Sequence, residues 1–354
     1  MLGIQEHDAL PVVQETIAYL AAEMPYETAV ETVSRLLPIS VSSECAQRIT
    51  TTVAADLQRE QDEERRAAFA DPAHSRFPEA VVKPTQEVAL VAIDGGMCRI
   101  RDQECYSEFK VGVMGTLDPR AAKEDAPAPV TSKHYVAHLT DADSIFEHIN
   151  VAMHRQGLHH CRTLQVLGDG APWIWNRADT LRSDGQELIL TLDVFHASEH
   201  LAEVSRVLFP CSDDQARAWA THMTSRLVHG DLDTFFKALR NEKHTAEQAA
   251  DTGKLEALKA KLAYFEERRH LLTYDTCRKR GLPIGSGIIE GGIRFVAKDR
   301  IHRTGMRWHT RGVEAILQLR AAIASKEWTA FTGRRTAKRM YAQQKLRLSL
   351  RPAA

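Results

Sequence analysis

The sequence predicts an α/β protein in which a mixed sheet is interrupted by an all-helical block and preceded by a small helical region. Three observations support this fold class. Short apolar runs of strand length recur between residues 86 and 196, residues 197–280 lack strand patterns, and residues 10–65 have helical periodicity. The chain has 354 residues and is 44% apolar, which is enough for a sizeable core.

The N-terminal region, residues 1–85, is predicted to contain helices followed by a linker. Two amphipathic stretches, 26–37 and 42–57, flank the turn-like sequence PIS. They resemble a helix-turn-helix, but a structural helical hairpin fits at least as well, because the second stretch has a single arginine, Arg48, and carries acids. Residues 58–85 are charged and then proline-containing, which predicts the linker.

The first part of the sheet domain, residues 86–196, is expected to contain five strands and two helices. The first and fourth strands end on the acids Asp94 and Asp169, and open α/β sheets bind their ligands at the carboxyl ends of strands. The predicted strands are 87–94, 107–117, 133–140, 162–169 and 187–196, and the predicted helices are 141–157 and 173–183.

The rest of the chain is expected to leave the sheet domain and then return to it. Residues 197–280 form the predicted helical insertion. Residues 281–330 begin with the sharp turn GLPIGSG, continue in a helix that carries Glu290, and complete the core with an amphipathic helix over 311–325. Residues 331–354 are expected to be a basic tail, loosely held.

Charge is distributed unevenly along the chain. Residues 268–354 contain 20 Lys and Arg against 5 Asp and Glu, whereas the whole chain has a net charge of −1. This asymmetry favours an anionic partner for the C-terminal part; the alternative is a solvated basic tail without a partner. No apolar run reaches membrane-spanning length, the first residues do not resemble a signal peptide, and the six cysteines form no C-x-x-C pair. We therefore expect a cytoplasmic protein without a membrane partner.

Three acids lie in corners of small residues: Asp94 in AIDGG, Asp169 in GDGAP and Glu290 in GSGIIEGG. A lone buried carboxylate is costly unless it is paired or bound to a metal. Three carboxylates from distant parts of the chain suit Mg²⁺ or Mn²⁺, and two such ions about 3.5–4 Å apart can drive phosphodiester cleavage. The small neighbours would leave room for a phosphate backbone. The alternative is that each acid caps a strand or helix end.

A second constellation, LDVFHASEHL, contains Asp193 and His196 in a D-x-x-H arrangement at the end of a predicted strand. We expect both side chains to support the metal site near Asp169 without binding a separate metal. The alternative is an Asp that caps a helix beside a partly buried His. No H-E-x-x-H, G-x-S-x-G or Walker A motif is present, so zincin, hydrolase and P-loop chemistry is disfavoured.

The stretch AKDRIHRTGMRWHTRG, residues 297–312, interleaves five basic residues with two His and one Trp, which suits a nucleic-acid backbone. The alternative is an exposed basic helix and loop. Trp173 is a candidate for stacking on a base, although packing at the end of a strand is the more common role of such a residue. The predicted DNA-binding residues are Lys298, Arg300, Arg303, Arg307, Trp308, Arg311 and Trp173.

Taken in order, AIDGG, GDGAPWIW, D-x-x-H with EHL, GSGIIEGG, DRIHRTGMRW and EAILQLRA resemble the ISKra-type insertion-sequence transposases, in the Mutator-like group of the DDE superfamily. The resemblance covers residues 86–330. It implies an RNase H-like catalytic domain interrupted by an all-helical insertion. It also implies that Asp94, Asp169 and Glu290 are the catalytic triad and bind two Mg²⁺ or Mn²⁺ ions, and that Asp193 and His196 form the group's D-x-x-H motif.

The expected function is therefore metal-dependent DNA cleavage at the element ends and strand transfer into target DNA. The expected partners are the terminal inverted repeats and the target DNA, on which we expect a homo-oligomer to assemble. The alternatives are an RNase H-like nuclease and a catalytically silent DNA-binding protein derived from a transposase. The chain departs from relatives in its first 80 residues, which are acidic and lack the zinc-ligand cysteines that some relatives carry.

Overall fold

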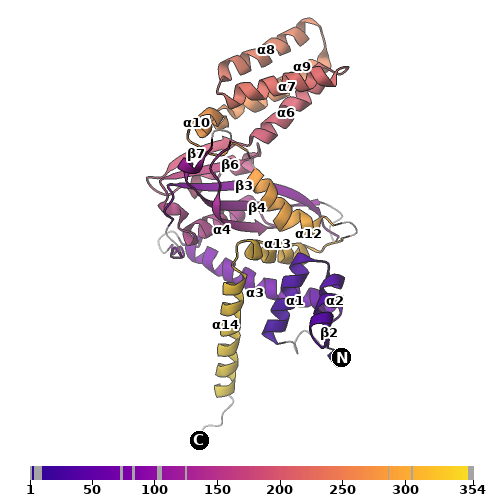
Figure 1. Ribbon diagram of the computed structural model, residues 1–354, viewed down its shortest axis with the longest axis vertical. Helices are drawn as coiled ribbons and strands as arrows, with labels where there is room; N and C mark the ends of the chain where they lie inside the picture. Colours follow the sequence, from indigo (N-terminus) through magenta and orange to yellow (C-terminus); the bar gives the residue numbers. More distant parts are fainter. Residues whose placement is uncertain are drawn as a thin grey trace.

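Figure 1 shows the computed structural model of the chain, which describes residues 2–3, 10–71, 75–81, 84–101, 106–123, 126–285, 287–303 and 306–349. A five-stranded sheet lies in the middle of an elongated molecule. Four helices extend from one end, and the N-terminal helices lie at the other end beside a long C-terminal helix (Figure 1). Within the described residues, no helix is long and apolar enough to cross a membrane. Residues 72–74 and 82–83 of the expected linker, Ser286, and the end of the tail at 350–354 lie outside the described residues.

The sheet is mixed and has the order β5-β4-β3-β6-β7. The first three strands form an antiparallel meander, and β6 and β7 then add parallel to β3. The prediction of an α/β fold is thus confirmed, and each predicted strand is present. The strands are β3 (Val88–Arg99), β4 (Tyr106–Leu117), β5 (Thr131–His138), β6 (Thr163–Gly168) and β7 (Glu187–Leu192).

Both faces of the sheet are covered, which explains why β3 is apolar at every position from Val88 to Ile93. Val88, Leu90 and Ala92 point into a core with helices α11 (Gly287–Ile293) and α13 (Thr310–Ala324). The alternate residues of β3 point into a second core with α4 (Ala142–Arg155). Short elements add to both sides. The π-helical turn at Arg294–Lys298 and α12 (Asp299–Ile301) belong to the first core. Helix α5 (Pro172–Trp175) and the 3₁₀ turns at Leu158–His160 and Ala178–Leu181 belong to the second. A further 3₁₀ turn lies at Pro119–Ala121.

Residues 194–280 are helical, so the helices begin three residues before the predicted 197–280 and the strand predicted over 187–196 ends at Leu192. The helices are α6 (Val194–Leu208), α7 (Asp213–Val228), α8 (Leu232–Gln248), α9 (Thr252–Glu267), a 3₁₀ turn at Arg269–Leu271 and α10 (Tyr274–Lys279). Asp193, Ser212 and Asp251 cap α6, α7 and α9, because each side chain accepts a hydrogen bond from a backbone N–H of the first turn. Phe235, Phe236 and other apolar side chains of these helices pack together in a core that reaches the sheet at Leu192 of β7.

The N-terminal region contains α1 (Pro11–Glu23), α2 (Tyr26–Leu36) and α3 (Ser43–Phe69), and two-residue strands β1 (Leu2–Gly3) and β2 (Ile39–Ser40). Helix α3 begins at the predicted cap, where the Ser42 side chain accepts from Cys45 N at 3.1 Å. It then continues through half of the stretch predicted as a linker, because its second half packs against α4, where Arg65 pairs with Glu147 at 2.6 Å. Helix α3 packs against α1, α2, α4 and α13. This packing fits the alternative interpretation of the N-terminal region as a structural helical hairpin.

The C-terminal tail is a helix, α14 (Trp328–Ser349), and the expectation of a loose segment is wrong for the described residues. Basic residues in the first half of this helix face acids of α1 and α3. Arg335 is 3% exposed and pairs with Asp56 at 2.8 Å and Glu15 at 3.1 Å. Arg334 and Lys338 both pair with Glu60. Part of the C-terminal positive charge is therefore neutralised within the chain.

Candidate metal centre

Asp94 lies inside β3, not at its end as the sequence suggested. The strand continues to Arg99 because β4 pairs with it over its whole length, whereas the parallel neighbour β6 ends opposite Ile93. Asp94 is therefore the first residue of β3 beyond the end of β6. Its Oδ1 accepts a hydrogen bond from Gly95 N at 2.7 Å.

Asp169 directly follows β6, as predicted, and therefore lies next to Asp94. Its Oδ1 accepts from Ala171 N at 2.8 Å, and its backbone carbonyl accepts from the indole Nε1 of Trp175 at 2.7 Å. The turn from Asp169 to Trp175 thus fixes both the side chain and the backbone of this acid. Trp175 is a packing and positioning residue of the turn.

The D-x-x-H motif lies at the start of helix α6. Asp193 is fully buried and caps the helix by accepting from Phe195 N at 2.9 Å, so the helix-cap alternative is correct for this residue. Its own N–H donates to Gly168 O at 2.8 Å, which ties the helix start to the end of β6. His196, in the first turn of α6, is half-buried, and its Nδ1 lies 3.4 Å from Glu199 Oε2.

Potential metal-ligand atoms of Asp94, Asp169 and His196 all lie within 4.8 Å of one another. We expected His196 to support the metal ligands from outside the site, but its ring nitrogen is one of the three converging ligand atoms. The D-x-x-H spacing was the signal that pointed to it. Two carboxylates and one imidazole fit a divalent cation; the nitrogen donor makes Mn²⁺ a better match than Mg²⁺, which prefers oxygen ligands.

The two carboxylates of this centre repel each other. Burial, followed by the charge of Asp169, raises the pKa of Asp94 from 3.8 to about 6, while the Gly95 N–H, His196 and Lys298 act in the opposite direction. A divalent cation between the two acids would remove this repulsion. The site therefore has the charge and the donor atoms of a cation site.

Glu290 lies in the first turn of α11, where it is exposed. The helix packs on β3 and β4 through Ile289 and Ile293, which turns the opposite side of the helix toward solvent. Glu290 is not part of the group of three that converges within 4.8 Å. The same helical run continues to Lys298, whose charge acts on Asp94.

The glycines beside the acids are explained mainly by packing within the protein. A Cβ on Gly95 would lie 2.6 Å from Glu108 Oε1, and one on Gly96 would lie 2.3 Å from the ring of Phe109. A Cβ on Gly170 would lie 2.2 Å from the Tyr264 hydroxyl. The expectation that these glycines leave room for a DNA backbone is therefore wrong at the first two corners, whereas Gly287 and Gly291, beside Glu290, face open space.

Two of the predicted DNA-binding residues are buried, and that prediction is wrong for them. Arg300 is 0% exposed; its Nε donates to Ala21 O at 3.0 Å, and its guanidinium lies over the rings of Tyr26 and Trp308. Trp308 is 4% exposed and donates from Nε1 to Ile301 O. Both residues attach the basic segment to the N-terminal helices, through Ala21 and Tyr26. The sequence of the basic segment alone could not predict these contacts, because they depend on residues at the other end of the chain.

The other predicted DNA-binding residues are accessible to different degrees. Trp173 is half-buried, lies edge-on to Phe146, and has Lys110 Nζ 5.2 Å from its ring centroid, so packing accounts for much of its surface. The exposed basic residues are Lys298, Arg303, Arg307 and Arg311.

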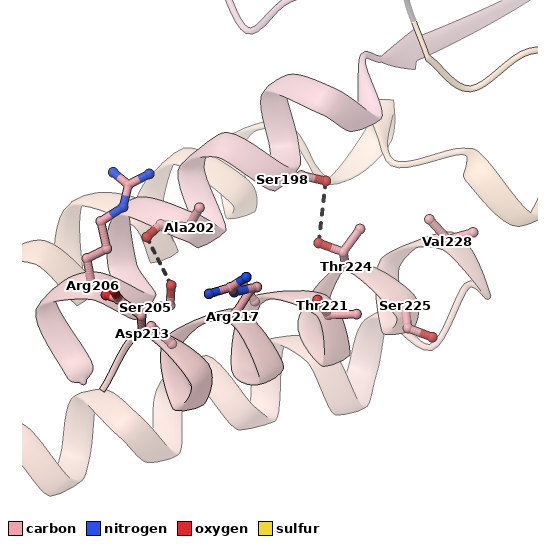
Figure 2. A pocket seen from close by; sticks show the side chains of 12 residues that line it. Ser198, Ala202, Ser205, Arg206, Asp213, Arg217, Thr221, Thr224, Ser225 and Val228 are labelled. Atoms are coloured by element: carbon pink, nitrogen blue, oxygen red, sulfur yellow. Dashed lines mark hydrogen bonds between the residues drawn. The ribbon is translucent and has the colours of Figure 1, made fainter. Parts of the chain in front are cut away.

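A separate open groove of about 640 Å³ lies between α6 and α7 in the insertion (Figure 2). Small and hydroxyl side chains form its floor, with Arg206 and Arg217 along it, and Thr224 donates to Ser198 at 3.4 Å across it. None of the three residues of the candidate metal centre lines this groove.

Comparison of the sequence with models of known protein families and with curated proteins gave no significant match.

Proposed function

We propose that the chain is a DDE transposase of a bacterial insertion sequence, which cuts DNA at the element ends and joins them to target DNA in a reaction that depends on Mg²⁺ or Mn²⁺. The observation that carries the proposal is the convergence of Asp94, Asp169 and His196 within 4.8 Å from three separate elements. A half-buried pair of carboxylates with a raised pKa in one of them is typical of a functional site.

The architecture is compatible with the RNase H-like catalytic domain that the sequence resemblance implies. Three antiparallel strands are followed by two parallel strands on the side of the first. Asp94 of β3 and Asp169 each directly follow the last residue pair of β3 and β6, Ile93 and Gly168. Helices α6–α9 then separate this part of the chain from the helix that carries Glu290, as an insertion in such a domain would.

In this proposal, Asp94 and Asp169 hold the cations between neighbouring strands, and His196 adds an imidazole from the start of α6. Bound there, Mg²⁺ or Mn²⁺ would activate the attacking hydroxyl and stabilise charge on the leaving oxygen. Asp193 fixes the start of α6 and thereby the direction of the His196 ring. Glu290 supplies the third carboxylate from the exposed side of α11 when DNA occupies the site.

DNA binding is assigned to the exposed basic side chains between residues 298 and 311. Among these residues, Lys298 is the one whose positive charge lowers the pKa of Asp94. Arg303, Arg307 and Arg311 follow it along the chain and are exposed. Such residues contact phosphates and position the duplex without reading its sequence.

The proposal is tested by incubating the protein with Mn²⁺ and a duplex that carries the DNA flanking its coding sequence. A transposase gives cuts at discrete positions and joined products; a nuclease gives cuts alone; a silent DNA-binding protein gives a shifted duplex without cuts. Asp169→Asn should abolish cleavage and retain DNA binding. Asp179→Asn, which removes an exposed acid from a nearby 3₁₀ turn, is the matched control and should cleave like the wild type.

A further inference from the structure

The helical insertion contacts the candidate metal centre at the end of α9. Arg268 donates from Nε and Nη2 to the carbonyl oxygen of Gly170, at 3.0 and 2.9 Å. Gly170 is the residue after Asp169, so the guanidinium holds the peptide that directly follows a proposed metal ligand. The Arg268 side chain is only 15% exposed, and hydrogen bonds from a guanidinium are among the stronger ones in proteins.

Tyr264 lies one helical turn before Arg268 and contacts the same peptide. The guanidinium carbon of Arg268 is 4.2 Å from the centroid of the Tyr264 ring, and Arg268 Nη1 also donates to Tyr264 O at 3.2 Å. The Tyr264 hydroxyl is so close to Gly170 that a Cβ there would lie 2.2 Å away. The ring therefore orients Arg268, while the hydroxyl limits how far the Gly170 peptide can move toward α9.

The opposite side of the turn is held by a residue of the sheet domain. Trp175 Nε1 donates to the Asp169 carbonyl, and the Asp169 side chain accepts from Ala171 N. Two consecutive carbonyls, those of Asp169 and Gly170, are thus fixed from two different structural units. This leaves the Asp169 carboxylate little freedom to leave the position from which it faces Asp94.

We propose that Tyr264 and Arg268 are positioning residues through which the helical insertion holds the Asp169–Gly170 turn in its cation-binding geometry. The inference rests on the proposed function in that Asp169 is taken as a metal ligand. It extends that function by giving the insertion a direct part in assembling the centre, in addition to any contact with DNA. A displacement of α9 is then transmitted to Asp169 through a single peptide.

The chain offers a matched pair of variants at neighbouring positions. Arg268→Gln removes both hydrogen bonds to Gly170. Arg269→Gln makes the same change one residue later, where the side chain pairs with the exposed Asp233 at 2.8 Å and lies over Phe236 within the insertion. Both variants lose one positive charge near the end of α9, but only the first loses contact with the metal-site turn.

The primary readout is Mn²⁺ binding by calorimetry in the absence of DNA. We expect Arg268→Gln to weaken Mn²⁺ binding roughly tenfold, the lower end of the effect of removing outer partners of a metal site. Arg268→Lys keeps one donor and should lose less. Arg269→Gln should bind Mn²⁺ as the wild type does. The tryptophan fluorescence should change only in the Arg268 variants, because Trp175, one of five tryptophans, lies on the turn.

A second variant tests the contact without altering any charge. Gly170→Ala keeps the carbonyl but forces the Tyr264 hydroxyl away, and we expect it to weaken Mn²⁺ binding while circular dichroism remains that of the wild type. Wild-type Mn²⁺ affinity in both Arg268→Gln and Gly170→Ala would overturn the positioning role and leave the proposed function standing. A wild-type protein that binds no Mn²⁺ would overturn both proposals, so the two failures are distinguishable.

Discussion

Replacing Asp94 by Asn should stabilise the protein without metal and remove its response to metal. Asp94 has a pKa raised from 3.8 to about 6, mainly by burial and then by the charge of Asp169. Each pKa unit corresponds to about 1.4 kcal/mol, so the ionised carboxylate opposes folding by up to ~3 kcal/mol at neutral pH. Because Asp94 is only half-buried, we expect the measured gain on substitution to be about 1–3 kcal/mol.

The direction of the pH dependence follows from the raised pKa. A carboxyl group that is easier to protonate in the folded state favours folding fully below pH 3.8, and this contribution is lost as the pH rises through 6. The advantage of Asp94→Asn should therefore be greatest at pH 7.5 and fall to about half at pH 5. The Asn side chain keeps an oxygen that can accept from Gly95 N, so the local hydrogen bond is retained.

Thermal unfolding in EDTA and in MnCl₂, at both pH values, measures these effects. A gain of 1–3 kcal/mol should raise the melting temperature by a few degrees. Mn²⁺ at about a hundred times its dissociation constant should stabilise the wild type by about 2.7 kcal/mol and the variant much less. The advantage of the variant should then be largely lost or reversed. An Asn variant that melts below the wild type in EDTA at pH 7.5 would refute the reasoning, because it would mean that Asp94 is a net stabilising group.

Three further predictions concern other parts of the chain. Glu290→Gln should leave the metal-free melting temperature within a degree, because Glu290 is exposed, and should abolish cleavage while DNA binding persists; wild-type cleavage would remove Glu290 from the site. Arg307→Ala should lower DNA affinity and reduce the salt dependence of DNA binding by about one released counterion. Arg300→Ala should instead lower the free energy of unfolding by about 3 kcal/mol or more, because its buried contacts are lost. Loss of stability in the Arg307 variant and loss of DNA affinity alone in the Arg300 variant would contradict the assignment of Arg307 to the surface and Arg300 to the core. Asp56→Asn should lower the free energy of unfolding by about 1–3 kcal/mol, since buried Arg335 keeps only Glu15 as a charged partner; a change below 0.5 kcal/mol, within the noise of surface substitutions, would show that this ion pair contributes nothing.

The sheet and the two aspartates could be predicted because their signals are local. A strand buried on both faces is apolar at every position, as β3 is from Val88 to Ile93, and the acid at its apparent end marks the point where β6 stops. The continuation of β3 to Arg99 could not be predicted from its own residues, because the long partner β4 imposes it.

Contacts between distant parts of the chain account for the other errors. Arg300 has the sequence context of a DNA-binding residue, but its partner Ala21 O is 279 residues away. The acids that hold α14 are equally remote from it, which is why a helix was expected to be a loose tail. The D-x-x-H motif predicts that His196 lies near the metal centre. Its position among the ligand atoms depends on the direction in which α6 continues from the end of β7, which the motif does not specify.

Helix α13 belongs to two cores at once. Val313, Ile316 and Leu317 pack under the sheet, while Ala315, Leu319 and Ala322 complete the core of α1 and α3. A helix buried on both sides couples the opening of the layers it joins, so amide hydrogens of α3 and β3 should exchange with similar protection. Helices α6–α9 share a different core, which includes Leu192 of β7 but no residue of α3 or β3, so we expect them to open separately from those two elements. The N-terminal helices are thus a cooperative part of the unit that contains the sheet, and deleting them would expose the outer side of α13 to water.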